Sequence, residues 1–299
     1  EDTYSQGFEV ITTIDSAKQL AGNEALIDGL ETYYDKLHGY RGADTNYPAI
    51  GQAPTLNWLQ QLQDVPVYGN QQPAIVVEVG TRSINALLKS GDVVAIPWEG
   101  MSWARPYIDQ NEAWPPPREA SDIVQLGDLI RVKAEGASWS LGQVPDIQGA
   151  LISMSPDDGK ILALAGGYDF RRSQVNRVLS ARPPGSNFKP FVYGAALENG
   201  YTAASTINDA PITRGDYRPN NYENNFLGPI TLRFALKESR NVPTVRLYDQ
   251  VGWENVLPFA AKFGFQSQSF PQNDLTVALG SQDVQPVELV TAYSIIANG

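Results

Sequence analysis

Hydrophobic and polar positions along the 299-residue chain change their period several times, and each change predicts a new element. Residues 7–14 alternate as a strand does, and Asp15 is suited to cap a helix over residues 16–36, where apolar residues recur near helical spacing. The residues that follow are rich in Gly, Pro, Asn and Gln around a short helical stretch at 55–63. The pattern therefore predicts that residues 1–72 form a linker region.

Between residues 73 and 140 the chain changes to short runs of β-branched and apolar residues, bounded by Gly, Ser and Asp. These runs lie at 74–79, 84–88, 92–96 and 128–132. Such a series of short strands predicts a small closed or half-open barrel, of which the oligonucleotide/oligosaccharide-binding (OB) fold is one candidate. Among the aromatic residues of the segment, Trp98, Trp103, Tyr107 and Trp114 are candidates for stacking a ligand. Because the sequence places no basic partners with them, we interpret them as packing residues rather than as a platform for stacking a ligand.

From residue 141 onward, strands and helices mix. Two apolar runs at 147–153 and 160–165 flank Ser-Pro-Asp-Asp-Gly and predict a hairpin. A helix is predicted after the Pro184-Gly185 turn, and its apolar stripe consists of Phe188, Phe191, Val192, Ala195 and Ala196. Further helices are predicted from Thr231 through Glu238, at 253–263 and at 286–297. The predicted fold class is therefore α+β, with mixed α/β content.

Composition limits the function classes. The chain has 22 Lys and Arg against 33 Asp and Glu, a net charge of −11, which argues against nucleic acid and against anionic lipid surfaces as partners. It has no Cys, so disulfides and thiolate chemistry are excluded. The single histidine, His38, stands apart from clustered carboxylates and is interpreted as a helix-end contact, so no metal is expected. No apolar run approaches the roughly 20 residues of a membrane span.

Candidate chemistry centres on Ser186 and Lys189, a Ser-x-x-Lys pair at the start of the predicted helix. Three residues are about 300° of helical rotation, so both side chains leave the same face. Free N–H groups at a helix start favour a developing oxyanion, and a desolvated lysine can be the base for a serine nucleophile. No acidic residue lies between Asp169 and Glu198, so we expect the pKa of Lys189 to be well below that of free lysine.

A second element, Ser239-Arg-Asn241, begins 53 positions after Ser186. Before Val242-Pro243, such residues are ordinary chemistry for the end of a helix. Alternatively, Ser239 and Asn241 can share one side of a loop, where the serine relays a proton and the asparagine amide binds a substrate. The residues alone leave both interpretations open.

The two motifs resemble those of the penicilloyl serine transferases, Ser-x-x-Lys and Ser-x-Asn. The surrounding residues narrow the resemblance to the transpeptidase region of class A, bifunctional penicillin-binding proteins of the 1a type, and residues 8–42 resemble the linker between their two enzymatic domains. The phrases that carry the resemblance are Gly166-Gly-Tyr-Asp-Phe170, Arg182-Pro-Pro-Gly-Ser-Asn-Phe-Lys-Pro-Phe191, Pro219-Asn-Asn-Tyr222, Gly228-Pro-Ile-Thr-Leu-Arg-Phe-Ala-Leu236, Ala278-Leu-Gly280 and Thr291-Ala-Tyr293.

The resemblance covers residues 8–42 and 139–299, and it implies a penicillin-binding-protein/serine β-lactamase-like transpeptidase domain over residues 141–299. The strand pattern, and not the resemblance, predicts the small OB-like insert over 73–140. It implies that Ser186 forms an acyl-enzyme, Lys189 accepts its proton, Ser239 shuttles a proton to the leaving amine, and Asn241 binds the substrate amide. The implied reaction is the D-alanyl-D-alanine transpeptidation that cross-links peptidoglycan stem peptides, with acylation by β-lactams and without a cofactor.

For the whole protein, the resemblance implies a glycosyltransferase domain and a membrane anchor upstream, on the periplasmic face of the bacterial inner membrane. The family's third motif, Lys-Thr/Ser-Gly, should follow Asn241, but the residues after it do not supply one. Lys89-Ser-Gly91 and Ser83-Ile-Asn85 spell two of the motifs but precede Ser186, and we interpret both as chance matches. We therefore expect the transpeptidase domain to be truncated and this chain alone to be inactive.

Two alternatives remain open. A serine β-lactamase or D,D-carboxypeptidase shares the first two motifs and differs in the lifetime of the acyl-enzyme. A non-enzymatic penicillin-binding sensor or scaffold is the other, with residues 73–140 recruiting envelope proteins, because that segment is acidic and aromatic and has no catalytic pattern of its own.

Overall fold

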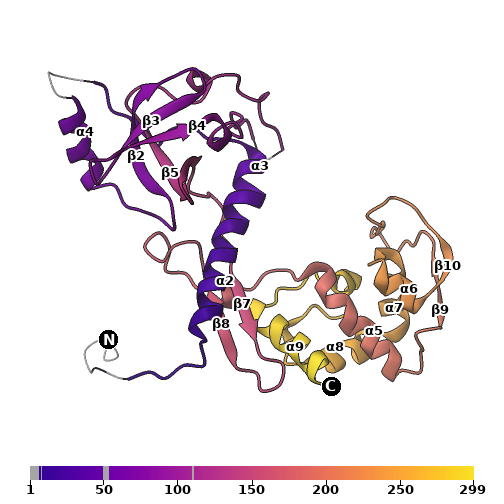
Figure 1. The fold of residues 1–299 in the computed structure, drawn as a ribbon. Coiled ribbons are helices and arrows are strands. Elements are labelled where there is room, and N and C mark those ends of the chain that lie inside the picture. The colour runs from indigo at the N-terminus through magenta and orange to yellow at the C-terminus, as the bar shows by residue number, and fades with distance from the viewer. Residues whose placement is uncertain (1–6, 8, 50–53, 110) are drawn as a thin grey trace. The chain divides into compact units, whose positions relative to one another are not determined.

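The computed structural model describes residues 7, 9–49, 54–109 and 111–299, shown as a ribbon in Figure 1. The chain divides into two compact bodies. The sheet body comprises Ala17–Leu151 and Ala165–Asn176. The helical body comprises Ile152–Leu164 and Arg177–Gly299, together with the described residues before Ala17. Among the described residues, no helix is long and apolar enough to cross a membrane.

The predicted first helix is confirmed in extent, although it is not regular throughout. Helix α2 (Ser16–Asp28) continues into a π-helical segment, η1 (Gly29–Asp35), and then into α3 (Lys36–His38), which His38 ends. The strand predicted over 7–14 is wrong where the structure describes it; residue 8 lies outside the described residues. Instead of forming a ladder, Thr13 Oγ1 and Asp15 N each make one hydrogen bond to the backbone of 161–162.

The sheet body is built around one six-stranded antiparallel sheet in the order β1-β5-β2-β3-β4, with β6 pairing the other part of β5. Its elements are β1 (Thr45–Asn46), α4 (Pro54–Gln63), β2 (Gln72–Val79), β3 (Ser83–Leu88), β4 (Val93–Pro97), β5 (Asp128–Glu135) and β6 (Ser138–Gly142). All four predicted runs are strands, and the helical stretch at 55–63 is confirmed as α4. The short strand β1 and the polar strand β6 were not predicted.

Side chains on β2 and β3 alternate between two cores, as the pleat requires. Ile75 and Leu87 pack with Trp58 and Leu62 of α4 on one face. On the other face the neighbours of Ile75 and Leu87 join a larger apolar cluster: Tyr40, Ala74, Val76, Ile84, Ala86, Leu88, Ile96, Met101, Ala104, Ala120, Val124, Ile130, Val132 and Leu141. The sheet is therefore covered on both sides.

The aromatic residues of the sheet body only partly follow the packing interpretation. Trp98 and Trp103 pack against the larger cluster, whereas Trp114 is 60% exposed. The premise that they lack basic partners is wrong, because the Arg82 guanidinium lies 4.7 Å from the Trp98 ring and the Lys36 amine 5.5 Å from Trp103. These cations come from α3 and from the turn before β3, so their sequence positions do not show the contacts.

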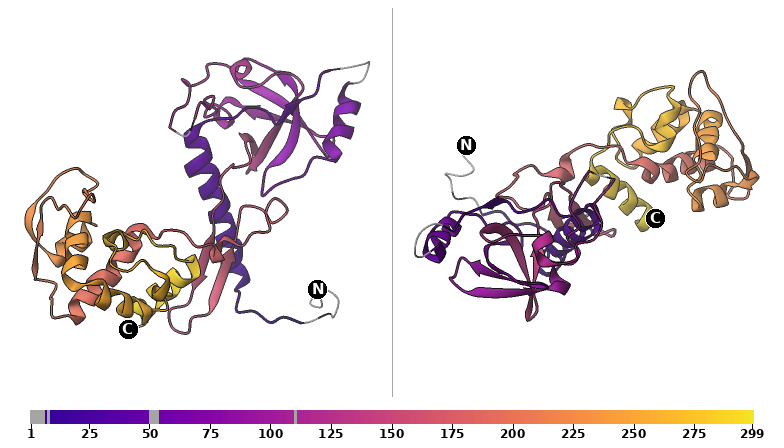
Figure 2. Two further views of the ribbon diagram at one scale, coloured as in Figure 1. Left: turned by 180° about the vertical axis from the view of Figure 1, so that it is seen from behind. Right: turned by 90° about the horizontal axis from the view of Figure 1, so that it is seen from above.

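The helical body contains two short hairpins and a group of helices, seen from two further directions in Figure 2. The predicted hairpin is confirmed as β7 (Leu151–Met154) and β8 (Ile161–Ala165), while β9 (Thr206–Asp209) and β10 (Gly228–Thr231) form a second antiparallel pair for which no strand was predicted. The helices are α5 (Lys189–Glu198), α6 (Leu232–Lys237), α7 (Asn241–Val251), α8 (Trp253–Ala261) and α9 (Pro286–Asn298). Of these, α7 was not predicted.

Helix α5 lies in the core of the helical body, against α7 and α8. All five residues of its predicted apolar stripe are 0% exposed. Phe191 stacks edge-on against Phe265 at 4.8 Å between ring centroids, and Phe188 against the same ring at 5.6 Å. Complete burial of this stripe fixes the rotation of α5, and with it the direction in which Lys189 at its first position points.

Candidate active site

The turn before Ser186 depends on two glycines. Gly185 has a left-handed φ of 57° and opens the 3₁₀ segment η5 (Gly185–Phe188). Gly185 N donates to Gly280 O at 3.1 Å, and a Cβ placed on Gly280 would lie only 2.2 Å from Gly185 O. Arg182 and Val284 exchange two backbone hydrogen bonds of 3.0 Å beside this contact. The segment around Gly280 therefore fixes the backbone that carries Ser186.

Ser186 is exposed and lies one 3₁₀ turn before Lys189, whose backbone N–H donates to Ser186 O. Side chains three residues apart on a 3₁₀ turn eclipse each other, so both project to the same side. The predicted place of Ser186 at a helix start is confirmed. Within residues 177–299, all of which are described, no hydrogen bond joins Ser186 Oγ to the Lys189 amine.

Ser239 follows the end of α6 at a position where glycine is usual. Its φ of 50° is left-handed. Its N–H donates to Leu236 O and the N–H of Arg240 donates to Ala235 O, at 3.0 and 2.9 Å. These two bonds form a Schellman motif. A serine in this conformation is strained, so neighbouring contacts must hold the turn.

The structure combines the two interpretations of this motif. Ser239 does end a helix, but Val242 and Pro243 do not stop the chain from being helical, because α7 begins at Asn241. Proline is tolerated there since the N–H groups of a first helical turn have no partner within the helix. The helix-end interpretation is therefore wrong in one respect, because Val242, the residue before Pro243, is itself helical.

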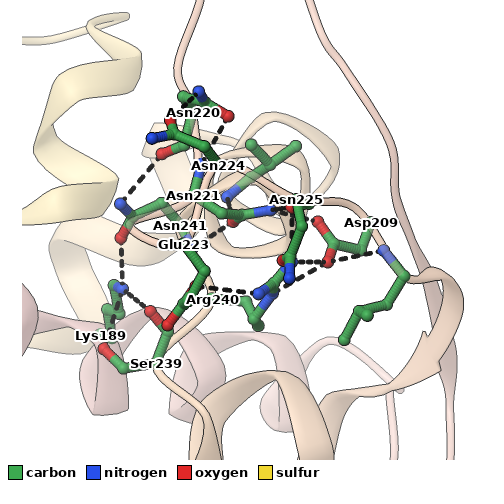
Figure 3. Close-up of polar contacts among 12 residues, drawn as sticks. Lys189, Asp209, Asn220, Asn221, Glu223, Asn224, Asn225, Ser239, Arg240 and Asn241 are labelled. Carbon is green, nitrogen blue, oxygen red and sulfur yellow. Dashed lines mark hydrogen bonds and ion pairs between the residues drawn. The ribbon is translucent and has the colours of Figure 1, made fainter.

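Arg240 has an extended backbone, with φ −64° and ψ 130°, so Ser239 and Asn241 project to one side of the turn and Arg240 to the other. On the first side they meet Lys189 (Figure 3). Lys189 Nζ donates to Ser239 O at 2.6 Å, Ser239 Oγ at 3.1 Å and Asn241 Oδ1 at 2.7 Å. An ammonium group has three N–H donors, and each has an acceptor here. The structure therefore brings three of the four predicted site residues together.

The electrostatics of Lys189 follow from its burial. The residue is only 1% exposed, and burial lowers its pKa to about 8, while the Glu223 carboxylate acts in the opposite direction. The expected lowering is thus present. The opposing carboxylate comes from a loop that sequence reasoning did not connect with this helix.

On the other side of the turn, the Arg240 side chain is buried in an ion pair. Arg240 is 4% exposed and Asp209, on β9, is 0% exposed. Arg240 Nε and Nη2 donate to Asp209 Oδ2 at 2.9 and 2.6 Å, and Nη1 donates to Glu223 Oε2 at 2.9 Å. Nη2 also donates to Asn225 O at 2.7 Å.

The asparagines of the loop between β9 and β10 tie the same turn to Asp209 (Figure 3). Asn221 Nδ2 donates to Asp209 Oδ1 at 2.7 Å, and Asn221 Oδ1 accepts from the N–H groups of Asn241 and Val242, both at 3.0 Å. Asn241 Nδ2 donates to Asn220 O at 3.1 Å. Sequence reasoning assigned these residues no role, although the phrase Pro219-Asn-Asn-Tyr222 and the middle position of Ser-x-Asn were the available signals.

The chance matches lie elsewhere, in the sheet body. Ser83-Ile-Asn85 belongs to β3, where Asn85 Nδ2 donates to Glu78 at 2.6 Å. Lys89 follows the same strand and its amine donates to Gln63 O at 3.0 Å. Among the described residues, no group of three or more His, Asp or Glu is placed to hold a metal ion.

Comparison with known proteins identifies the family of this chain. Residues 149–299 match the family described as the penicillin binding protein transpeptidase domain, and residues 40–147 match the penicillin-binding protein OB-like domain. This chain belongs to the penicillin-binding protein family. The predicted fold class is confirmed, whereas the domain boundaries at 72/73 and 140/141 stay predictions.

The resemblance to the 1a type is confirmed as well. The whole chain is 44% identical to penicillin-binding protein 1A of Pseudomonas aeruginosa and 37% identical to that of Escherichia coli. A crystal structure of penicillin-binding protein 1A from Haemophilus influenzae matches 97% of the chain with a TM-score of 0.82 and 29% identity, and 42% of that chain is covered. The present chain spans 37% and 36% of the lengths of the first two relatives.

Proposed function

We propose that this chain carries the serine acyl-enzyme site of a peptidoglycan D-alanyl-D-alanine transpeptidase. One observation supports this most directly. The buried Lys189 amine, three residues after an exposed serine, contacts both polar side chains of the Ser-x-Asn element. A lysine with a lowered pKa in this position can act as the base for Ser186.

In the proposed reaction, Ser186 Oγ attacks the carbonyl carbon of the penultimate D-alanine, and its proton passes to neutral Lys189. The peptide C–N bond breaks, the leaving D-alanine amine receives a proton through Ser239, and an ester joins Ser186 to the stem peptide. The amine of a second stem peptide then attacks the ester, which forms the cross-link and restores the Ser186 hydroxyl. Asn241 binds the substrate amide.

The contacts of Lys189 define what must change during this cycle. A neutral amine has two N–H donors and one lone pair, so it cannot keep all three acceptors of the resting arrangement. One contact has to open before the amine can accept a proton from Ser186. Catalytic hydrogen bonds of this kind commonly tighten only when substrate is bound.

A fluorescent penicillin tests the proposal in the intact natural protein. Attack on the β-lactam ring opens it while the amine stays attached, so the acyl-enzyme should accumulate to one label per chain. Ser186→Ala should abolish labelling, and Ser90→Ala, in the chance match of the sheet body, should label as the parent does. Labelling that survives Ser186→Ala would disprove the assignment, and rapid turnover of a chromogenic cephalosporin would instead indicate a β-lactamase.

For the whole protein we propose the wider setting that the 1a-type resemblance implies. It comprises a glycosyltransferase domain and a membrane anchor upstream, and a location on the periplasmic face of the inner membrane. Peptidoglycan stem peptides are the proposed substrates and β-lactams the proposed inhibitors. Envelope proteins are proposed partners of residues 73–140, where the exposed Trp114 is a candidate contact. Trp114→Ala should weaken capture of such partners while leaving acylation unchanged.

A further inference from the structure

The turn that presents Ser239 and Asn241 is held from behind by the residue between them. The two outer residues face the Lys189 amine, while Arg240 reaches into the body with all three guanidinium nitrogens bound. Within residues 177–299, all of them described, the side-chain hydrogen bonds of Arg240 go to Asp209, Glu223 and Asn225, and none goes to the lysine. Arg240 therefore lies at the site without facing the amine.

Asp209 is a fixed point for this guanidinium. It lies on β9, whose four residues pair with β10 from Thr206↔Thr231 to Asp209↔Gly228. Besides Arg240, its carboxylate accepts from Asn221 Nδ2 at 2.7 Å and from Leu227 N at 3.3 Å. Asn221 in turn holds the first two N–H groups of α7. The Asp209 carboxylate is therefore connected to the turn in two ways, by its hydrogen bonds from Arg240 and by its hydrogen bond from Asn221.

The turn needs such a restraint because of Ser239. A left-handed φ of 50° at the Schellman position suits glycine, and a serine there relaxes readily unless its neighbours are fixed. Residues in such conformations persist only where the surrounding structure determines them. Arg240, the residue after Ser239, supplies that restraint, because two of its guanidinium nitrogens donate hydrogen bonds to the buried Asp209 carboxylate.

We propose that Asp209 and Arg240 are positioning residues that hold Ser239 and Asn241 against the Lys189 amine, and that acylation of Ser186 depends on them although neither touches the lysine. This inference rests on the proposed function of Ser186. The competing explanation is that the ion pair serves stability only, as other buried pairs do.

The two explanations differ in what they predict for the amine. All three of its acceptors come from the turn, and acceptors favour the charged form of a lysine. Loosening the turn removes these acceptors and also the burial that lowers the pKa of Lys189, so it should shift that pKa and misplace the relay and the substrate amide contact. A stability role alone leaves the pH profile of acylation unchanged. The Glu223 carboxylate in the β9–β10 loop is the charged group that raises the pKa of Lys189. Other charged or titratable groups on the elements around Lys189 include Tyr193 and Glu198 on α5, Asp209 on β9, Glu238 and Arg240 at the turn, Arg246, Tyr248 and Asp249 on α7, and Asp274 before the 3₁₀ segment at 275–279.

The test compares Arg240→Lys with Arg246→Lys in the intact natural protein. Arg246 lies on α7, the helix that begins directly after Arg240, and it also joins α7 to the β9 region, through Asn208 O and Ala210 O at 3.0 Å, but it is not part of the turn. In both variants lysine keeps the positive charge but lacks the planar guanidinium that can donate to two groups at once. The rate constant of labelling by fluorescent penicillin is measured from pH 6 to the alkaline plateau, and amide hydrogen exchange is followed at Asn241 and Val242.

Arg240→Lys should lower the plateau rate at least tenfold, shift the midpoint of the pH profile away from that of the parent, and speed exchange at the two amides. Arg246→Lys should change none of these, whatever its effect on the melting temperature. The proposal is overturned if both variants lose rate only in proportion to their loss of stability, with unshifted pH profiles.

If Arg240→Lys does not fold, the double variant Asp209→Leu/Arg240→Met decides, because it removes both charges and leaves neither one buried alone. A folded double variant that acylates within twofold of the parent contradicts the proposal, and a folded one with the tenfold loss and shifted profile supports it. Failure of the proposed function would look different: either the parent protein would not be labelled by fluorescent penicillin, or the Ser186→Ala variant would still be labelled.

Discussion

Each body buries one arginine that joins segments far apart in the sequence, but the two acidic partners differ. In the sheet body Arg131 is 6% exposed, and both Nε and Nη2 bind Asp44 Oδ2 at 2.8 Å. Arg240 of the helical body is as deeply buried and binds Asp209 in the same way. The side chain of Asp44 is 42% exposed, whereas that of Asp209 is 0% exposed. Water can therefore replace the first partner but not the second.

The two pairs also differ in what they hold. Arg131 Nη1 also donates a hydrogen bond to Pro66 O at 2.6 Å, and the guanidinium lies over the Tyr68 ring. Arg131 therefore joins the segment before β1 and the segment before β2 to strand β5. Arg240 holds a strained turn whose other side faces the candidate base. The same guanidinium chemistry thus supports a sheet in one body and the geometry of a site in the other.

The largest expected effect comes from removing the two carboxylates. Asp209→Ala leaves the buried Arg240 with only the half-exposed Glu223 as a counter-charge and should lower the free energy of unfolding by about 3–5 kcal/mol. Asp44→Ala should cost only about 1–2 kcal/mol, because water can take the place of the exposed Asp44 carboxylate. Urea unfolding followed by 19F NMR of fluorotryptophan can separate the bodies, since Trp253 alone among the six Trp lies in the helical body. Equal losses would contradict the comparison.

Lys189 and Lys133, one in each body, give the next largest contrast. Lys189→Arg keeps the charge but cannot release a proton near neutral pH, so acylation should fall at least about a hundredfold. Lys133 is bound to Glu31 at 3.2 Å in the sheet body, and Lys133→Arg should acylate within about twofold of the parent. Both rates are measured with fluorescent penicillin. A Lys189→Arg variant within tenfold of the parent would mean that the base lies elsewhere.

A comparison of Gly280 and Gly91 distinguishes the cost of a left-handed φ from the cost of steric contact with neighbouring atoms, because both have a positive φ but only Gly280 lies against other backbone atoms. Gly280, with φ 71°, lies against Gly185 O, so Gly280→Ala should cost about 2–4 kcal/mol and displace the turn before Ser186. Gly91, with φ 90°, has open space where a Cβ would project, so Gly91→Ala should cost only about 1 kcal/mol. Thermal unfolding and labelling are compared for both. Similar losses would show that φ alone matters at Gly280.

The smallest effect concerns pH. Acylation should rise with pH through about 8, as the Lys189 ammonium loses its proton. Glu223 raises the pKa of Lys189, so Glu223→Gln should shift the profile to lower pH and speed acylation at pH 7 about two- to threefold, a modest effect because this side chain is half exposed. Glu238→Gln is the control, since Glu238 pairs with Lys237 at 2.9 Å. A shift in the opposite direction would show that Glu223 does not stabilise the ammonium.

Local patterns in the sequence predicted much of the fold. The stripe on α5 is buried as expected, Thr231 Oγ1 caps α6 by accepting from Phe234 N at 3.2 Å, and the hairpin around Gly159 forms. Each of these features depends on residues that lie close together in the sequence. The strand predicted over 7–14 is absent from the described residues, because alternation of apolar and polar residues does not by itself supply a second strand to pair with. Helix α7 was not predicted, because Pro243 near its start indicates, in the sequence alone, that a helix ends there.

The sequence by itself determined the family, the Ser186–Lys189 pair and the place of that pair at the start of a helix, because three-residue spacing and a preceding Gly185 act locally. It could not assign Asp209, Asn221 or Glu223 to the site. Their distances from Lys189 along the chain are long, and only the packing of β9 and its loop against α7 brings them near. Tertiary structure also decided that Arg240 points away from the amine, because the extended backbone at that residue alternates the side chains while burial of Asp209 fixes the charge on the far side.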